Sequence, residues 1–259
     1  MPLLAWIILF TAAGGLLSAL AASMFLVAPE SLRARVLPHL VSFATGALLS
    51  AALLGLLPHA IEGAGLAAAH QIGLTLLGGL LVFFVLEKLV LWRHCHQDIC
   101  EGHVPHDHDR DAASASLILI GDGFHNVLDG VLIAAAFMTD VHLGVVTAIA
   151  VTAHEIPQEV GDLAILLHSG MSRARALTLN LLTSVTSVLG GIAAYFLLAD
   201  VTRLLPFAIA LAASSFLYIA VADLIPGLHR RVDPGSGAKQ FLFIVLGVAM
   251  IYVSHRIAH

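Results

Sequence analysis

The chain has 259 residues, of which 59% are hydrophobic and 11% are charged, and its formal net charge is −5. Soluble domains carry about 25% charged residues, so this composition excludes a soluble globular protein. The apolar segments are long and do not alternate with polar residues, which predicts an all-α integral membrane protein. There is no basic patch that would indicate nucleic-acid binding.

Eight apolar segments are each long enough to cross a bilayer as a helix, which needs about 20 residues. They lie at 4–28, 36–60, 66–92, 114–139, 141–168, 174–199, 203–227 and 239–257. The first begins near Met1 without a basic leader, so we expect a retained span and not a cleaved signal peptide. Residues 1–259 are therefore predicted to form a single polytopic transmembrane domain.

Basic residues are unequally divided between the two sides that these spans define. Nine lie in the connections after spans one, three, five and seven, against only Arg203 and Arg256 on the other side, with Lys88 inside span three. Because cytoplasmic loops are enriched in Lys and Arg, both termini are predicted to be extracytoplasmic. We expect the protein in the plasma (inner) membrane.

Pairs of prolines twenty residues apart mark spans two and seven. Leu-Pro at 37–38 and 57–58 matches Leu-Pro at 205–206 and Ile-Pro at 225–226. The two spans would run in opposite directions, so spans one to three and six to eight are predicted to form an inverted repeat around spans four and five. Inverted repeats are common in transporters, where the binding site lies at their interface.

A histidine-rich segment follows span three, and we expect a cytoplasmic loop over 93–113. Its candidate metal ligands are imidazoles and thiols, namely His94, Cys95, His96, Cys100, His103, His106 and His108. Such a mixture suits borderline and soft metal ions, although the spacing fits no closed zinc finger. The segment either captures metal at the inner mouth of the protein or is a polar linker whose histidines bind nothing.

Span four carries ionisable side chains near its centre, where each costs about 2.5–3.5 kcal/mol to insert. His125 and Asp129 are one helical turn apart, and Asp122 and Asn126 lie beside them. A membrane helix keeps such groups when a metal ion, a proton or a polar substrate path compensates them. The sequence therefore predicts a functional site in this span.

Span five carries a matching polar group in an otherwise apolar segment. His154 and Gln158 are one turn apart, Glu155 lies next to them, and Asp162 lies one turn beyond Gln158. Two polar stripes on neighbouring spans predict one shared intramembrane site. Imidazole and carboxylate groups are the ligands that zinc and other borderline divalent cations take.

We predict four ligands for one cation, with an adjoining site that shares Asp129. The first set is His125, Asp129, His154 and Gln158, and the adjoining site uses Asn126 and Glu155. Further candidate ligands, placed less centrally, are Asp122, Glu159, Asp162 and Asn180. The alternative for these residues is a set of buried ion pairs and interhelical hydrogen bonds without transport.

These motifs resemble those of a known family. Residues 125–130 are similar to the H-N-x-x-D/E-G motif of the ZIP family of metal transporters, and residues 154–162 to the H-E-x-P-x-E-x-G-D motif of its LZT branch. The resemblance covers essentially the whole chain and implies a binuclear centre between spans four and five that passes divalent metal, typically zinc, toward the cytoplasm. Carried over position by position, it implies ligands at His125, Asn126, Asp129, His154, Glu155 and Gln158.

Gln158 departs from the family pattern, since the LZT motif has histidine at this position and other branches have glutamate. An amide is a weaker ligand, so Fe²⁺, Mn²⁺ and Cd²⁺ stay open beside Zn²⁺ as the transported ion. The expected partners are divalent metal ions and the lipid bilayer, with a homodimer left open and no nucleic acid.

Two other functions share parts of the motifs. An intramembrane zinc metalloprotease uses H-E-x-x-H, but the second histidine is Gln158 here and Pro157 interrupts the helix. A cation-diffusion exporter uses paired H-x-x-x-D sites, but six spans and a soluble C-terminal domain would then be expected. Because the chain also has no G-x-x-x-x-G-K motif for ATP, we predict a secondary transporter or permease and not an enzyme.

Overall fold

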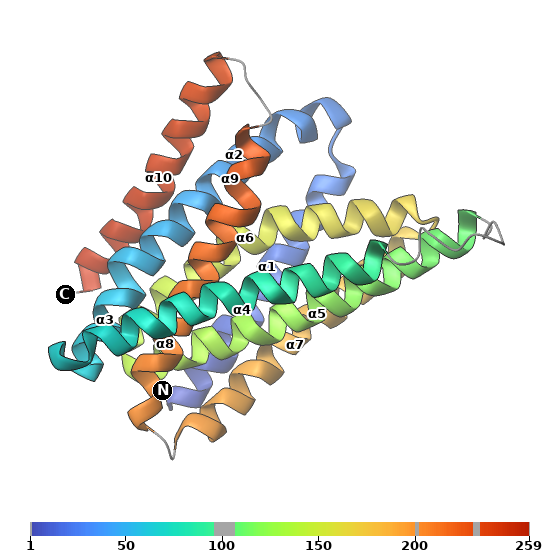
Figure 1. The fold of residues 1–259 in the computed structure, drawn as a ribbon. Helices are drawn as coiled ribbons and strands as arrows, with labels where there is room; N and C mark the ends of the chain where they lie inside the picture. The colour runs from blue at the N-terminus through green and yellow to red at the C-terminus, as the bar shows by residue number, and fades with distance from the viewer. Residues whose placement is uncertain (1, 96–106, 200–201, 230–233, 259) are drawn as a thin grey trace.

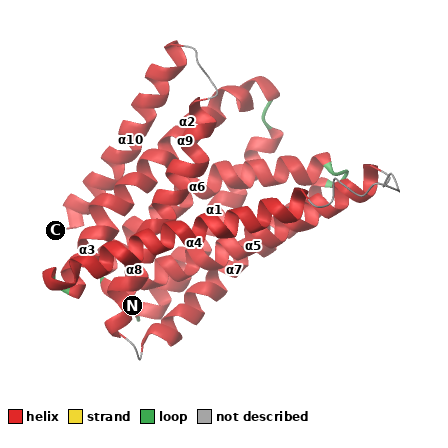
Figure 2. Cartoon of the chain, viewed as in Figure 1, coloured by secondary structure: helices red, strands yellow, loops and turns green. Residues whose placement is uncertain are grey.

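The chain folds into a bundle of long helices (Figures 1 and 2). The computed structural model describes residues 2–95, 107–199, 202–229 and 234–258, and all regular elements in these ranges are helical. The main helices are α1 (Leu3–Val27), α2 (Glu30–Ser50), α3 (Leu57–Ala64), α4 (Ala69–Cys95), α5 (Asp107–Thr139), α6 (Val141–His168), α7 (Arg173–Ala199), α8 (Leu205–Tyr218), α9 (Ile225–His229) and α10 (Pro234–Ala258). Shorter π or 3-10 segments are η1 (Ala51–Leu56), η2 (Leu66–Ala68), η3 (Thr202–Leu204) and η4 (Ile219–Leu224). The all-α prediction is confirmed.

Within the described part of the chain, seven helical segments are long and apolar enough to cross a membrane. Each coincides with a predicted span, and α2, η1 and α3 together make one of them, as do α8, η4 and α9. The remaining predicted span, the fifth in chain order, is α6, whose 28 residues include three acids that lower its hydropathy. It packs among α1, α2 and α5, so those acids meet protein and not lipid.

The helices divide into an inner and an outer set. Helices α1, α5, α6 and α7 pack against one another, whereas α10 packs mainly on α2 and α4 mainly on α8. In the membrane-spanning parts of α4 and α10 only 11% and 17% of residues are buried, as expected for helices that face lipid. Alanines supply much of the buried core, which lets the inner helices approach closely.

The two proline-marked spans share an unusual backbone feature. In each, a π-helical segment (η1 or η4) begins 13 residues after the first proline (51 − 38 and 219 − 206) and ends two residues before the second. The N–H of Leu57 reaches back five residues to Ala52, and that of Ile225 reaches back five to Ala220. A proline lacks an N–H and its ring crowds the preceding turn, so a wider turn relieves the clash.

These segments also pack reciprocally, as an inverted repeat requires. Helix α8 contacts η1 while α2 contacts η4, and Figure 1 shows α2 and α8–α9 running in opposite directions. A shift of 168 residues relates close contacts as well, since Gly46 in α2 packs on Gly247 in α10, and Ser214 in α8 packs on Gly79 in α4. The proline pairs thus mark a genuine structural repeat.

The histidine-rich segment is more helical at its ends than predicted. Helix α4 continues to Cys95 and α5 already begins at Asp107, so part of the loop expected over 93–113 is helix. The predicted metal ligands of this segment, from His94 to His108, fall outside the described residues or side chains.

Asp140 makes the turn between α5 and α6 and caps the start of α6. Its Oδ1 accepts hydrogen bonds from the backbone N–H groups of His142 (2.8 Å) and Leu143 (3.0 Å). Partial burial works to raise the pKa of Asp140, but these two donors outweigh it and hold the pKa below its ordinary value. The cap therefore stabilises the protein above the pKa that aspartate has when unfolded, and this contribution is lost as the pH falls through the lower folded pKa.

Replacing Asp140 with alanine is expected to cost about 1 kcal/mol of stability at pH 7, the usual loss for an N-cap. Thermal unfolding of the purified protein in detergent would measure it, and the difference from wild type should shrink near pH 3. Asp140→Ser is the matched control, because serine keeps a capping oxygen without the charge. Equal midpoints for the alanine variant and wild type at pH 7 would contradict the capping role.

Candidate metal centre

The α5–α6 hairpin brings the two predicted polar stripes to one depth. His125 precedes Asp140 by 15 residues (140 − 125) and His154 follows it by 14 (154 − 140). At 1.5 Å per residue both histidines therefore lie about 21–23 Å from the turn along antiparallel helices. A connection of one residue leaves little freedom in this register, so the sequence spacing itself sets the two imidazoles opposite each other.

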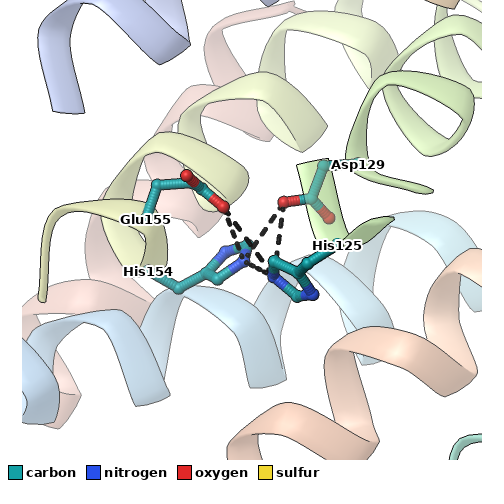
Figure 3. Close-up of side chains that lie close together, drawn as sticks. All are labelled: His125, Asp129, His154 and Glu155. Atoms are coloured by element: carbon teal, nitrogen blue, oxygen red, sulfur yellow. Dashed lines mark hydrogen bonds and ion pairs between the residues drawn. The ribbon is translucent and has the colours of Figure 1, made fainter. Parts of the chain in front are cut away.

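Four of the six expected ligands converge between these helices (Figure 3). The Nε2 atoms of His125 and His154 are 3.1 Å apart. The Oδ2 atom of Asp129 lies 3.6 Å from Nε2 of His125 and 3.3 Å from Nε2 of His154. The Oε1 atom of Glu155 lies 3.8 and 3.9 Å from the same two nitrogens. One atom from each of the four residues thus falls within 4.8 Å of all the others.

The ring of His154 is oriented for binding through Nε2. Its Nδ1 lies 3.2 Å from the backbone carbonyl of Ala150, one turn earlier in α6. A proton on Nδ1 is donated to that carbonyl, which leaves the lone pair on Nε2 facing the cluster. Hydrogen bonds of this kind fix the tautomer of metal-binding histidines and raise their basicity.

Within the described part of the chain, no group donates a hydrogen bond to the carboxylates of the cluster. Asp129 and Glu155 are 1% and 3% exposed, and none of their four oxygens accepts a hydrogen bond. The sequence from 111 to 172, which covers nearly all of α5 and α6, contains neither Lys nor Arg. Buried carboxylates without partners are strongly disfavoured, so this arrangement calls for a bound cation.

The spacing of the four atoms suits a zinc-sized ion. Zinc binds nitrogen and oxygen at about 2.0–2.2 Å, so tetrahedral ligands sit about 3.3–3.6 Å from one another. The two imidazole nitrogens are 3.1 Å apart, and their distances to the carboxylate oxygens are 3.3 to 3.9 Å. These distances bracket that range. Two imidazoles and two carboxylates can therefore close around one divalent cation with small adjustments.

The other two expected ligands lie beside this cluster. Asn126 is 2% exposed and donates its side-chain amide to the backbone carbonyl (3.2 Å) and to Oδ1 (3.0 Å) of Asp122. Gln158 is half-buried, interacts with the Asp122 side chain and lines a cavity together with His154. The four-residue cluster thus contains Glu155 where the first predicted ligand set has Gln158. Gln158 as a ligand of the first site and Asn126 as a ligand of the adjoining site stay predictions.

The cavity next to His154 involves residues that the sequence did not single out. Its volume is about 190 Å³, and its walls are formed by Val41, His154, Pro157, Gln158, Ile219 and Leu224. Val41 comes from α2, and Ile219 and Leu224 come from η4. These three wall residues therefore belong to the two halves of the repeat. The proline pairs marked these spans, but no polar residue pointed to their contact with the centre.

The less central candidates lie beside the four-residue cluster. Glu159 in α6 is fully buried and accepts hydrogen bonds from Nδ2 of Asn180 and from Oγ of Ser184 in α7, the latter at 3.2 Å. Asp122 is tied to Asn126, as described above, and Asp162 lies half-buried near the end of α6. Glu159, Asp122 and Asp162 are therefore distinct from the four-residue cluster.

Comparison with known proteins identifies the family. A profile described as ZIP zinc transporter matches residues 93–255, which contain the whole cluster. The chain belongs to the ZIP family. It is 30% identical to zinc transporter ZIP13 of Homo sapiens over 83% of this chain and 70% of that protein. It is 28% identical to zinc transporter zipt-7.1 of Caenorhabditis briggsae over 96% of this chain and 78% of that protein.

A shorter match has a higher identity. Zinc transporter foi of Drosophila melanogaster is 40% identical over 53% of this chain and 19% of that protein. Membership of the ZIP family confirms the prediction that this chain is a multi-pass transporter and not an enzyme. The metalloprotease and the cation-diffusion exporter are thereby excluded.

Proposed function

We propose that this ZIP chain carries zinc across a membrane toward the cytoplasm. The observation that carries the proposal is the meeting of His125, Asp129, His154 and Glu155 halfway along α5 and α6, in a stretch of sequence (111–172) that contains no Lys or Arg. The relatives named above are zinc transporters, which supports zinc as the main substrate. The borderline ligand set also suits Fe²⁺, Mn²⁺ and Cd²⁺ as further substrates.

The proposed direction follows from charge. With nine basic residues on one side, that side is assigned to the cytoplasm and both termini to the outside of the plasma (inner) membrane. A membrane potential of 100 mV, negative inside, favours uptake of a divalent cation by about 4.6 kcal/mol, twice the value for one charge. The histidine-rich segment at 94–109 would then collect metal at the inner mouth. For the assembly, we propose a homodimer.

The centre is proposed to be binuclear. The four-residue cluster would hold one ion, and Asn126 would help to hold a second, with Asp129 and Glu155 shared between the two ions. Gln158 would weaken the binding of the first ion on the cavity side, which favours release because an ion that binds too tightly cannot leave.

Zinc uptake into sealed vesicles tests this function. The purified chain is reconstituted with a zinc-sensitive dye inside, its orientation is determined by protease access, and the rate is followed as the inside-negative potential is varied. We expect saturable uptake from the predicted extracytoplasmic side that increases with the potential. A rate equal to that of protein-free vesicles would contradict the proposal.

Replacing Gln158 with histidine is expected to lower the KM for zinc by about tenfold, the scale on which ligand-shell changes alter metal affinity. The maximal rate should fall as well, because the added imidazole slows release. KM and maximal rate for Zn²⁺, Mn²⁺ and Cd²⁺ would be compared with those of Gln158→Asn, which keeps an amide. An unchanged KM for zinc in the histidine variant would place Gln158 outside the path of the ion.

A further inference from the structure

A second group of buried oxygen ligands lies one helical turn from the metal centre. Asp122 precedes Asp140 by 18 residues (140 − 122) and Glu159 follows it by 19 (159 − 140), so the hairpin places them at one depth. The corresponding separations for His125 and His154 are 15 and 14. Both acids are therefore displaced along their helices in one direction, by about 5–7 Å, toward the side assigned to the cytoplasm.

These two acids are buried and form no ion pair with Lys or Arg in the described part of the chain, and the basic side chain that acts on the charge of Asp122 is His125. Asp122 is 5% exposed and Glu159 is 0% exposed, and their charges act on each other. Asn180 and Ser184, which donate hydrogen bonds to Glu159, are neutral. The Asn126 amide, which donates a hydrogen bond to Asp122, is neutral as well. Since α5 after Arg110 and all of α6 lack Lys and Arg, the protein provides no cation of its own along these helices.

Two oxygens in this group accept no hydrogen bond from any of the described residues. They are Oδ2 of Asp122 and Oδ1 of Asn180, which is only 1% exposed. The Nδ2 atom of Asn180 is engaged by Glu159, so the unpartnered Oδ1 of the same amide is held next to that carboxylate. Buried polar atoms are nearly always paired, and an unpaired set that consists only of acceptors is what a cation site looks like before the ion binds.

We propose that Asp122, Glu159 and Asn180 form an inner cation site that receives the metal ion from the centre before it reaches the cytoplasm. The direction of this transfer rests on the proposed function, whereas the existence of the site does not. Its ligands are all oxygens, with Ser184 supporting Glu159, so it should bind hard divalent cations such as Mn²⁺ and hold zinc more weakly than imidazole does. A weaker site on the exit side would let zinc leave without a large barrier.

Mn²⁺ binding to the purified full-length chain, followed by electron paramagnetic resonance, tests the site directly. Four proteins would be compared: wild type, Asp122→Asn with Glu159→Gln, His125→Ala with His154→Ala, and Glu62→Gln as an exposed control in α3. The histidine-rich segment is the same in all four and cancels in the differences. We expect the Asp122/Glu159 variant to lose one bound Mn²⁺ per chain relative to wild type, and the histidine variant and the control to retain it.

The single variant Glu159→Gln guards against misfolding. Glutamine has the shape of glutamate and offers a carbonyl to Asn180 and an NH₂ to Ser184, so both contacts persist. In vesicles we expect its maximal zinc uptake to fall about tenfold, with KM on the extracytoplasmic side unchanged.

The outcomes separate the two proposals. Mn²⁺ binding equal to wild type in a folded Asp122/Glu159 variant would overturn the inner site, whatever the transport result. Loss of one Mn²⁺ from that variant, together with no zinc uptake by the wild-type chain, would support the inner site and overturn the proposed function.

Discussion

Replacing Asp129 with asparagine is expected to reduce zinc uptake by at least about 100-fold. Asp129 is almost fully buried and its Oδ2 lies within 3.6 Å of both imidazole nitrogens, so it is the carboxylate closest to both. Asparagine keeps the shape but removes the charge that balances a divalent ion. Loss of an outer-shell partner already costs about 10–100-fold in metal affinity, and a direct ligand should cost at least as much.

Initial rates of radiolabelled zinc uptake into vesicles would measure this loss. Glu62→Gln removes a carboxylate from the exposed surface of α3 and should transport at the wild-type rate. Elution as a single peak on size exclusion would show that the Asp129 variant is folded. Uptake within threefold of wild type by folded Asp129→Asn would contradict the assignment of the centre.

The position of the four-residue cluster could be predicted because it depends on few degrees of freedom. Two histidines at nearly equal distances from a one-residue turn lie at the same depth in an antiparallel hairpin. The periodicity of the helix then places the residues one turn away on the same face. Hydropathy was less informative for α6, since Glu155, Glu159 and Asp162 lower its score although the helix is buried by its neighbours. The acids that indicate a site in this span therefore also weaken its hydropathy signal.

The roles of Asn126 and Gln158 could not be derived from spacing. Both lie on the expected face, but each also lies within reach of Asp122, which competes with a metal ion for their side chains. The period of a helix says which residues share a face and not which partner each side chain chooses. That choice depends on α7, whose Asn180 and Ser184 engage Glu159 while its Thr183 interacts with Asp122.

The π-helical turns were likewise beyond sequence reasoning, although the prolines that cause them were visible. A proline inside a helix can bend it, break it or widen one turn, with similar local cost. Packing selects among these, because η1 lies against α8 and η4 lies against α2. The repeat therefore determines the backbone at the two positions where its halves meet.

Gly130→Ala is expected to abolish most zinc uptake, even though Gly130 has no side chain that could bind the ion. A Cβ at this position would overlap the backbone carbonyl oxygen of Ser187 and lie 2.8 Å from the backbone nitrogen of Gly191 in α7. Since both obstacles are backbone atoms, α5 must move away from α7. Such overpacking typically costs about 1–3 kcal/mol.

Asp129 is the residue next to Gly130, so the displaced helix would carry its carboxylate away from the two imidazoles. A shift of about 1 Å is enough to disable a site that needs four groups within bonding distance of one ion. Gly121→Ala, on the same helix, is the matched control. A Cβ at Gly121 would meet no described atom outside the helix's own backbone within 4 Å. Thermal midpoint and zinc uptake should both fall for Gly130→Ala and neither for Gly121→Ala. Wild-type uptake by the Gly130 variant would mean that the α5–α7 contact does not position the centre.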